Sequence, residues 1–175
     1  MKRAVYPGSF NPPTVGHVAI VKAAIRLHEL DRIDLVVSEV ALAKPMIEKP
    51  SLEERLQVIT ASFTDFPEVN VLRTSLQLIA DIARGYDVVV MGADKWVQIN
   101  DVQFYDSKAH MLESLSSLPT LAVAPRSGEN VDESIRLDVP ETISEVSSSS
   151  ARRANFEWMT KAAQDFSVES GAWQS

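Results

Sequence analysis

Short, continuous apolar runs recur along this chain and are separated by longer stretches with helical spacing. The runs are rich in valine, isoleucine, leucine and alanine, and they lie at residues 4–6, 33–37, 69–72, 88–91 and 121–124, with Asp34 and Asn70 as polar interruptions. Strands that are apolar at successive positions are buried on both faces, as in parallel sheets covered by helices. Strands that alternate with helices form right-handed β-α-β units. The pattern therefore predicts an α/β fold, a doubly wound parallel sheet in a single domain.

Several of the intervening segments carry helix signals. Ser51 and Glu54 form a potential capping box, and apolar residues then recur at spacings of four and three through Phe63. Thr74 is placed to cap a helix carrying Leu76, Ala80 and Ala83. The last helix is expected to begin within residues 147–150 and to continue through Phe156 and Met159.

The end of the sequence has no periodic pattern. We therefore expect a domain at residues 1–166, followed by a partly disordered tail at residues 167–175.

The composition excludes several classes of protein. The 175 residues carry a formal net charge of −7, which argues against a broad surface for nucleic acid or anionic membranes. Cysteine is absent, which removes disulfides, thiolate catalysis and cysteine-based zinc sites. No apolar stretch reaches the roughly 18 residues of a membrane span, and the run after Met1 meets Pro7 too early for an export signal. We expect a cytoplasmic protein with neither nucleic-acid nor membrane partners.

The stretch from Gly8 to His17, GSFNPPTVGH, joins the first strand to the first helix. Gly8 has no Cβ and lets a ligand approach the backbone closely. Thr14 and His17 stand three residues apart, so they share one face of the first helical turn, where free N–H groups attract anions. These features predict a phosphate-binding corner. The alternative is that Thr14 is only a helix cap and His17 a surface histidine.

This stretch carries a family resemblance. The sequence YPGSFNPPTVGHVAI, within residues 5–20, resembles the signature of the HxGH/TxGH nucleotidyltransferases, with Thr14-Val15-Gly16-His17 as the threonine variant. That family transfers a nucleoside monophosphate from a nucleoside triphosphate and releases pyrophosphate. It includes nicotinate and nicotinamide mononucleotide adenylyltransferases, phosphopantetheine adenylyltransferase and glycerol-3-phosphate cytidylyltransferase. The resemblance implies a Rossmann-like fold and an enzyme.

A second match lies near the end of the resemblance. Residues 146–152, VSSSSAR, occupy the place of the family motif ISSTxIR. The hydroxyls and amides of Ser148 and Ser149 can meet phosphate oxygens while they cap a helix. Arg152 can pair with the β- and γ-phosphates through a bidentate fork. The alternative is a flexible serine-rich loop with a solvated arginine.

Other matches lie in the middle of the chain. Gly92-Ala93-Asp94 resembles the G-[AS]-D motif of pyridine-nucleotide adenylyltransferases, whose aspartate accepts hydrogen bonds from the ribose; Asp94 could equally cap the next helix. Lys44 resembles a family lysine near the transferring phosphate, although it could be a solvated lysine in a polar loop. Arg55 resembles a family arginine near the second substrate, although it could equally form a surface i,i+4 pair. Trp96 could stack on a base or pyridine ring, or belong to the core.

These matches imply an adenylyltransferase that moves AMP from ATP, with Mg²⁺, to a small phosphorylated acceptor. The opening block is similar to phosphopantetheine adenylyltransferase, whereas GAD and the PRSG turn at residues 125–128 are similar to nicotinate mononucleotide adenylyltransferase. We expect a nicotinate or nicotinamide mononucleotide adenylyltransferase of NAD biosynthesis. The alternatives are a phosphopantetheine adenylyltransferase of coenzyme A biosynthesis, a cytidylyltransferase and a non-catalytic nucleotide-binding protein. A homo-oligomer is compatible with the sequence.

The resemblance implies three overlapping sets of site residues. The catalytic set is Thr14, His17, Lys44 and Arg152. The nucleotide-binding set is Gly8, Ser9, Phe10, Gly16, His17, Gly92, Asp94, Ser148, Ser149 and Arg152. The acceptor-binding set is Ser9, Lys44, Arg55 and Trp96. No set of metal-ligating side chains is expected, because Mg²⁺ bound to a triphosphate commonly keeps its waters.

Overall fold

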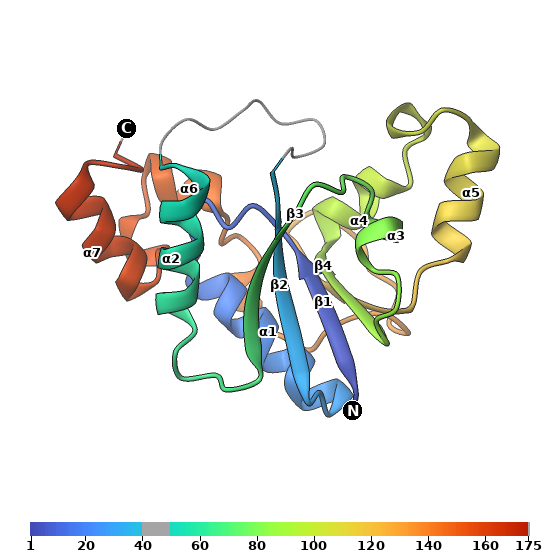
Figure 1. Ribbon diagram of the computed structural model, residues 1–175, viewed down its shortest axis with the longest axis horizontal. Coiled ribbons are helices and arrows are strands. Elements are labelled where there is room, and N and C mark those ends of the chain that lie inside the picture. The colour runs from blue at the N-terminus through green and yellow to red at the C-terminus, as the bar shows by residue number, and fades with distance from the viewer. Residues whose placement is uncertain (40–49, 175) are drawn as a thin grey trace.

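A parallel five-stranded sheet forms the centre of the computed structural model, which describes residues 1–39 and 50–174 (Figure 1). The strands are β1 (Arg3–Pro7), β2 (Arg32–Ser38), β3 (Val69–Thr74), β4 (Val88–Gly92) and β5 (Thr120–Ala124). They are arranged in the order β3-β2-β1-β4-β5, and every neighbouring pair is parallel. The expected doubly wound α/β sheet is confirmed.

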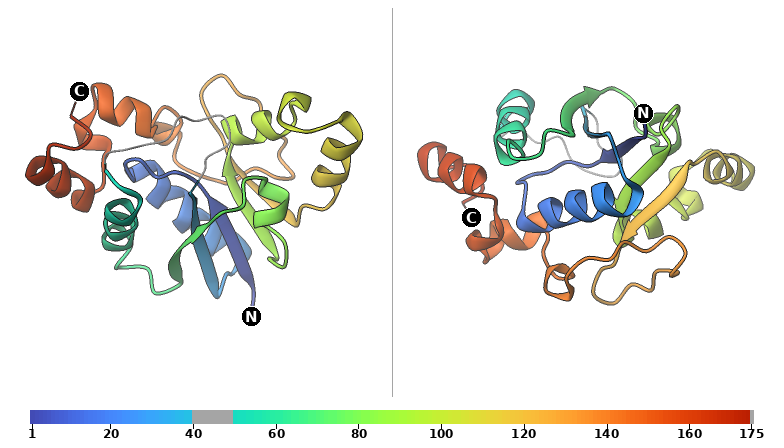
Figure 2. Two further views of the ribbon diagram at one scale, coloured as in Figure 1. Left: turned by 45° about the horizontal axis from the view of Figure 1, so that its top comes forward. Right: turned by 90° about the horizontal axis from the view of Figure 1, so that it is seen from below.

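Helices cover both faces of this sheet (Figure 2). They are α1 (Val15–His28), α2 (Leu52–Ser62), α3 (Ile79–Ile82), α4 (Ala93–Ile99), α5 (Lys108–Ser116), α6 (Ser148–Arg153) and α7 (Lys161–Ser170), with 3₁₀ turns at Val102–Phe104, Glu141–Ile143 and Phe156–Trp158. One apolar cluster joins the sheet to α1 and α2, and a second joins it to α3 and α4. This division follows from right-handed crossovers that run in opposite directions from β1.

Successive strand residues supply these two clusters in turn. In β1, Ala4 and Tyr6 belong to the cluster with α1, whereas Val5 belongs to the cluster with α3. In β4, Val88 and Val90 belong to the cluster with α1, whereas Val89 and Met91 belong to the cluster with α3. The continuous apolar runs in the sequence therefore reflect a sheet that is buried on both faces.

The strand order places a crevice beyond the carboxyl ends of β1 and β4. The chain winds from β1 outward through β2 to β3, and then returns to the other side of β1 to form β4. Connections on the two sides of this switch point leave in opposite directions, so the loops after β1 and β4 diverge and open a ligand-sized space. The loop that begins at Gly8 and the turn at Gly92 both lie at this edge.

The segment between β3 and β4 is less helical than the sequence predicts. Thr74 ends β3 instead of capping a helix, and its Oγ1 accepts a hydrogen bond from the Leu76 amide at 3.1 Å. The helix that follows, α3, has only four residues. The local hydroxyl-to-amide bond satisfies a backbone donor in a turn, which competes with helix formation at this point.

The end of the chain is more regular than the sequence predicts. The last helix stops at Arg153 instead of continuing through Met159, and a separate helix, α7, then runs to Ser170. The prediction of an irregular segment from Ser167 is therefore wrong for residues 167–170. The small residues Ala163 and Ser167 are fully buried in α7, which packs on α2. Phe166 and Val168 are the only large apolar side chains of α7, so the sequence offers few apolar positions from which to recognise this helix.

A buried carboxylate in β2 forms hydrogen bonds with residues of β2, of β3 and of the segment before β4. Asp34 in β2 is fully buried and receives hydrogen bonds from Arg32 Nε at 2.6 Å, the Tyr86 hydroxyl at 2.7 Å and Asn70 Nδ2 at 3.3 Å. Burial alone would raise the pKa of Asp34, but the hydrogen bonds from Tyr86, Arg32 and Asn70 hold it below its usual value. Burial and the bond to Asp34 together raise the pKa of Tyr86 to about 12.

We expect Asp34→Asn to lower the free energy of unfolding at pH 7 by about 2 kcal/mol, because it removes the charge that accepts hydrogen bonds from Arg32 and Tyr86, which are themselves only partly buried. The folded-state pKa of Asp34 is depressed, so its contribution is present above the unfolded-state pKa and is lost as the pH falls through the folded-state value. Urea unfolding should therefore show the largest difference between wild type and variant at neutral pH, and a shrinking difference below about pH 4. Exposed Asp65→Asn is the control, expected within about 0.5 kcal/mol of wild type; equal effects of the two variants would contradict the assignment.

Candidate active site

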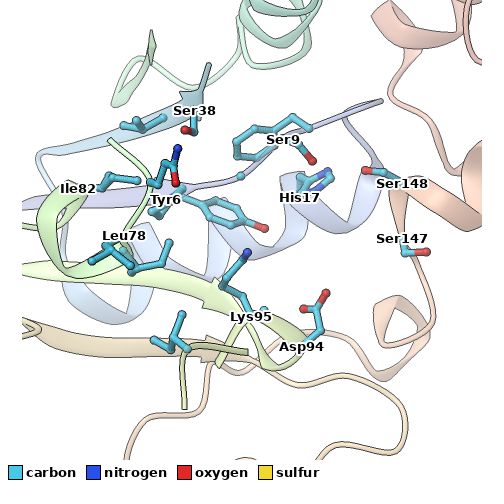
Figure 3. Close-up of a pocket in the computed structure, with 18 of the residues that line it drawn as sticks. Tyr6, Ser9, His17, Ser38, Leu78, Ile82, Asp94, Lys95, Ser147 and Ser148 are labelled. Carbon is cyan, nitrogen blue, oxygen red and sulfur yellow. The ribbon is translucent and has the colours of Figure 1, made fainter. Parts of the chain in front are cut away.

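A cavity of about 290 Å³ occupies the crevice beyond β1 and β4 (Figure 3). The loop after β1, the start of α1, the start of α4 and the serine run of residues 147–149 contribute polar side chains to it. Leu78 and Ile82 line one end, whereas His17 and Ser148 lie toward the other, with Tyr6 and Lys95 between them. The cavity thus joins an apolar compartment to one lined with hydrogen-bonding groups.

Most of the residues that the sequence implicated line this cavity. They are Gly8, Ser9, Phe10, His17, Arg55, Gly92, Asp94, Ser148 and Ser149. Thr14, Gly16, Arg152 and Trp96 do not line it. Lys44 lies outside the described residues, so its implied role stays a prediction.

Thr14 and His17 form a reciprocal capping box at the start of α1. The Thr14 amide donates to His17 Nδ1 at 2.9 Å, and the His17 amide donates to Thr14 Oγ1 at 3.4 Å. Because Nδ1 accepts a hydrogen bond, the proton of the neutral ring resides on Nε2. Thr14 is both the helix cap and, through this contact, the residue that sets the tautomer of His17. With only 1% of its surface exposed, Thr14 acts on the cavity through the imidazole.

Aromatic packing holds the imidazole from the other side. The Phe10 ring lies 4.9 Å from the His17 ring and 5.2 Å from the Tyr6 ring, which it meets edge-on. Phe10 is almost fully buried, and its backbone adopts a left-handed conformation with a φ of 44°. Burial raises the pKa of Tyr6 well above its usual range, so its hydroxyl is neutral in the cavity.

Gly16 explains how the serine run reaches the cavity. A Cβ on Gly16 would lie 3.1 Å from Cγ1 of Val146, closer than an ordinary contact. Without that atom, the first turn of α1 packs directly against the segment that leads into α6. The contact places Ser147, which caps α6 by accepting a bond from the Ser150 amide at 3.1 Å, beside the cavity.

The serine run and Arg152 hold the loop after β1. Ser148 Oγ donates to the Pro12 carbonyl at 2.7 Å, and an Arg152 guanidinium nitrogen donates to the Asn11 carbonyl. The opening loop and the start of α6 therefore converge, as the sequence predicts. Arg152, however, lies against the loop backbone and not in the cavity itself. Burial, with a contribution from Arg153, lowers the pKa of Arg152.

Arg55 is a buried cation in the wall of the cavity. It lies in α2 with only 6% of its surface exposed, and Nη1 donates to the Ser9 carbonyl at 3.3 Å. Its Nε is buried without a hydrogen-bond partner, and none of the carboxylates in the described segments forms an ion pair with it. Burial lowers the pKa of Arg55, because desolvation disfavours its charged form. An anion in the cavity would supply the missing partner.

Asp94 lies in the first turn of α4, where the negative charge is favoured by the helix dipole. Gly92 is the N-cap of this helix, so the alternative that Asp94 caps it is wrong. The Asp94 carboxylate is largely exposed and stands 3.8 Å from Arg126 Nε. It is therefore accessible to a ligand hydroxyl.

Several cavity residues were not implicated by sequence. Arg126 lies in the PRSG turn that the sequence singled out, and it also donates to the Val146 carbonyl. Lys95 lines the cavity, whereas its neighbour Trp96 turns away into the apolar cluster beneath α4. Asp94 and Lys95 occupy the side of α4 that lines the cavity, and Trp96, the next residue along the helix, packs against the sheet. The expected alternative for Trp96, a core position, is the one that the structure shows.

Neither a cluster of metal-ligating side chains nor a membrane-spanning helix occurs among the described residues. Within residues 1–39 and 50–174, no group of three or more histidine, aspartate or glutamate side chains is placed to hold a metal ion. In the same part of the chain, no helix has both the length and the apolar character needed to cross a bilayer.

The chain is similar in sequence to several adenylyltransferases. A phosphopantetheine adenylyltransferase of Flavobacterium psychrophilum is 33% identical over 123 residues, covering 69% of this chain and 76% of that enzyme. A probable nicotinate-nucleotide adenylyltransferase of Sulfurimonas denitrificans is 29% identical over 154 residues, covering 81% and 80%. The match to a phosphopantetheine adenylyltransferase of Dictyoglomus thermophilum, 37% identical over 91 residues, spans only about half of each chain, 52%.

The fold has a counterpart of known structure. Plasmodium falciparum nicotinic acid mononucleotide adenylyltransferase, solved in complex with NaAD, superposes with a TM-score of 0.69 over 99% of this chain and 98% of that one, at 15% identity. The likeness confirms the Rossmann-like fold. The cytidylyltransferase-like family model matches residues 5–154. The chain therefore belongs to the cytidylyltransferase-like family, and its adenylyltransferase relatives indicate a nucleotidyltransferase enzyme.

Proposed function

We propose that this protein transfers AMP from ATP to a small phosphorylated acceptor, and that the acceptor is nicotinate or nicotinamide mononucleotide. The observation that carries the proposal is one cavity that joins the His17 imidazole, the serine run and the buried Arg55 guanidinium. Asp94 and Arg126, from the two motifs shared with the nicotinate mononucleotide enzymes, line the same cavity. Phosphopantetheine is the second candidate, because Leu78 and Ile82 offer an apolar compartment to an uncharged arm.

The reaction needs no protein nucleophile. An acceptor phosphate oxygen attacks the α-phosphorus of ATP in line, a new P–O bond forms, and the bond to the β-phosphate oxygen breaks to release pyrophosphate. Catalysis then consists of positioning and of stabilising the charge that develops on the phosphates. Mg²⁺ would enter with the triphosphate as part of the substrate, since Mg²⁺ usually keeps waters and phosphate oxygens as ligands.

Each side chain has a role that follows from its position. His17 Nε2–H donates to an α-phosphate oxygen, because Nδ1 is held by the Thr14 amide. The backbone amides at the start of α6 and the Ser149 hydroxyl donate hydrogen bonds to the leaving phosphates. Arg55 binds the phosphate of the acceptor, and Asp94 accepts from a ribose hydroxyl.

An acceptor panel tests the function directly. Pyrophosphate release with Mg²⁺-ATP should rise with nicotinate or nicotinamide mononucleotide and stay at background with glycerol 3-phosphate. Preference for phosphopantetheine would select the second candidate, and CTP in place of ATP would indicate a cytidylyltransferase. Nucleotide binding without pyrophosphate release for any acceptor would show a non-catalytic binding protein and overturn the proposal.

His17→Asn separates the two roles of the imidazole. Asparagine can accept the Thr14 amide bond at the cap, but it lacks the distal Nε2–H donor. We expect kcat to fall about 100-fold, the size typical of one lost donor to a developing oxyanion, with little change in thermal stability. His110→Asn on α5 is the matched control and should turn over normally. Wild-type turnover by His17→Asn would remove the assigned role.

Arg55→Met separates acceptor binding from stability. The change deletes a buried charge and keeps an unbranched apolar side chain in place of the arginine stem, so the free energy of unfolding should stay constant or rise. The KM for the acceptor should rise about tenfold to 100-fold, because a charge-assisted bond to phosphate is lost, while the KM for ATP stays within about twofold. Exposed Arg73→Met is the control. A rise in the KM for ATP alone would place Arg55 at the nucleotide instead.

A further inference from the structure

The segment that follows α7 reaches back to the loop after β1. The Trp173 indole Nε1 donates to Asn11 Oδ1 at 2.6 Å, and the two residues are 8% and 6% exposed. The donor and the acceptor are 162 positions apart in the sequence. A hydrogen bond sealed from water in this way fixes the orientation of the Asn11 amide, because breaking it would leave a buried oxygen without a donor.

This bond is one of several that hold the same loop. Four successive residues of the loop are each contacted by the last third of the chain: the Asn11 carbonyl by Arg152, the Pro12 carbonyl by Ser148, the Pro13 carbonyl by the Thr160 amide, and Thr14 by a backbone bridge to Met159. All four contacts use the loop backbone: two come from side chains and two pair it with another stretch of backbone. Trp173 differs because it holds a side chain of the loop.

The conformation of Trp173 is itself enforced. Its φ is 61°, in the left-handed region that L residues rarely adopt. The segment is folded back by two hydrogen bonds. Ser167 Oγ donates to the Ala172 carbonyl at 2.6 Å, and the side-chain Nε2 of Gln174 donates to the Ser167 carbonyl at 2.8 Å. The indole packs 5.5 Å from the Phe166 ring. Strained conformations of this kind persist only where the surroundings determine them.

Asn11 is adjacent to the second strained residue. Phe10, with a φ of 44°, precedes Asn11, and its ring lies 4.9 Å from the His17 ring. A rotation of the Asn11 backbone would move Phe10 and so release the imidazole from one side. The contacts therefore form a continuous path from Trp173 through Asn11 and Phe10 to His17.

We propose that Trp173 is a positioning residue, which holds Asn11 so that Phe10 and His17 keep their places in the cavity. The effect on turnover rests on the proposed function, whereas the effect on the loop does not. Trp173→Phe preserves an aromatic ring for packing but deletes the N–H donor. Trp158→Phe is the matched control. Trp158 packs against the apolar cluster that contains Trp173 and Ala163, and its indole makes no hydrogen bond to the described loop residues.

The first measurement is hydrogen exchange of the substrate-free protein. We expect amides in peptides covering residues 8–17 to exchange about tenfold faster in Trp173→Phe than in wild type, with no change in Trp158→Phe. In wild type, the Trp173 indole N–H should be strongly protected in NMR exchange. An unprotected indole, or equal exchange of the loop in both variants, would overturn the proposal even if the protein had a different activity.

The second measurement is steady-state kinetics. Trp173→Phe should lower kcat about tenfold and leave the KM for ATP within about twofold, whereas Trp158→Phe should match wild type. Asn11→Leu removes the acceptor from the other side, and adding Trp173→Phe to it should speed loop exchange no further. Additive effects in the double variant would show that the two residues act separately and would refute the path. If Trp173→Phe fails to fold, loop exchange in Asn11→Leu and protection of the wild-type indole decide the question.

Discussion

The reciprocal hydrogen bonds between Thr14 and His17 make the start of α1 and the chemistry of the imidazole one structure. A helix start must satisfy its first amides, and here the Thr14 amide is satisfied by the ring nitrogen nearer the backbone. That choice leaves the proton on the distal nitrogen, on the side of the cavity. Rotation of the imidazole away from this arrangement would remove the cap as well as the donor. Local stability of the helix therefore favours the tautomer that has a donor on Nε2, as the proposed phosphate contact needs.

The cavity lies where the loop after β1 meets the start of α6, near the two ends of the segment that matches the family model. The loop after β1 has few hydrogen bonds of its own and takes its shape from α6, Met159 and Thr160. Gly16 and Val146 set the spacing between the two parts. Because these contacts are separated by more than 100 positions in the sequence, the site forms only in the fully folded domain. Loss of the contacts between the opening loop and α6 would therefore separate two parts of the cavity wall.

Sequence reasoning predicted the parts of this molecule that leave a local signature. The buried strands, the capping box of Ser51 and Glu54 and the motif from Gly8 to His17 are all encoded by neighbours in the chain. Sequence reasoning could not predict that Arg152 would contact a carbonyl of the loop instead of entering the cavity, or that Lys95 would line the cavity and Trp96 would not. Those outcomes depend on the rotation of a helix about its axis and on distances across the fold. The helix that extends to Ser170 was not predicted because it contains few large apolar side chains.

The electrostatics of the cavity link ligand binding to folding. The chain has a net charge of −7, yet Arg55, Arg126 and Lys95 lie in the wall of one cavity, where they offset the acidic surroundings locally. Arg126 has Asp94 nearby, but Arg55 is buried with an unsatisfied Nε, an arrangement that destabilises the substrate-free protein. An anionic ligand that pairs with Arg55 removes this cost in the folded state alone, because water already solvates the guanidinium in the unfolded chain. The same buried charge that weakens the empty domain therefore increases its preference for phosphorylated ligands.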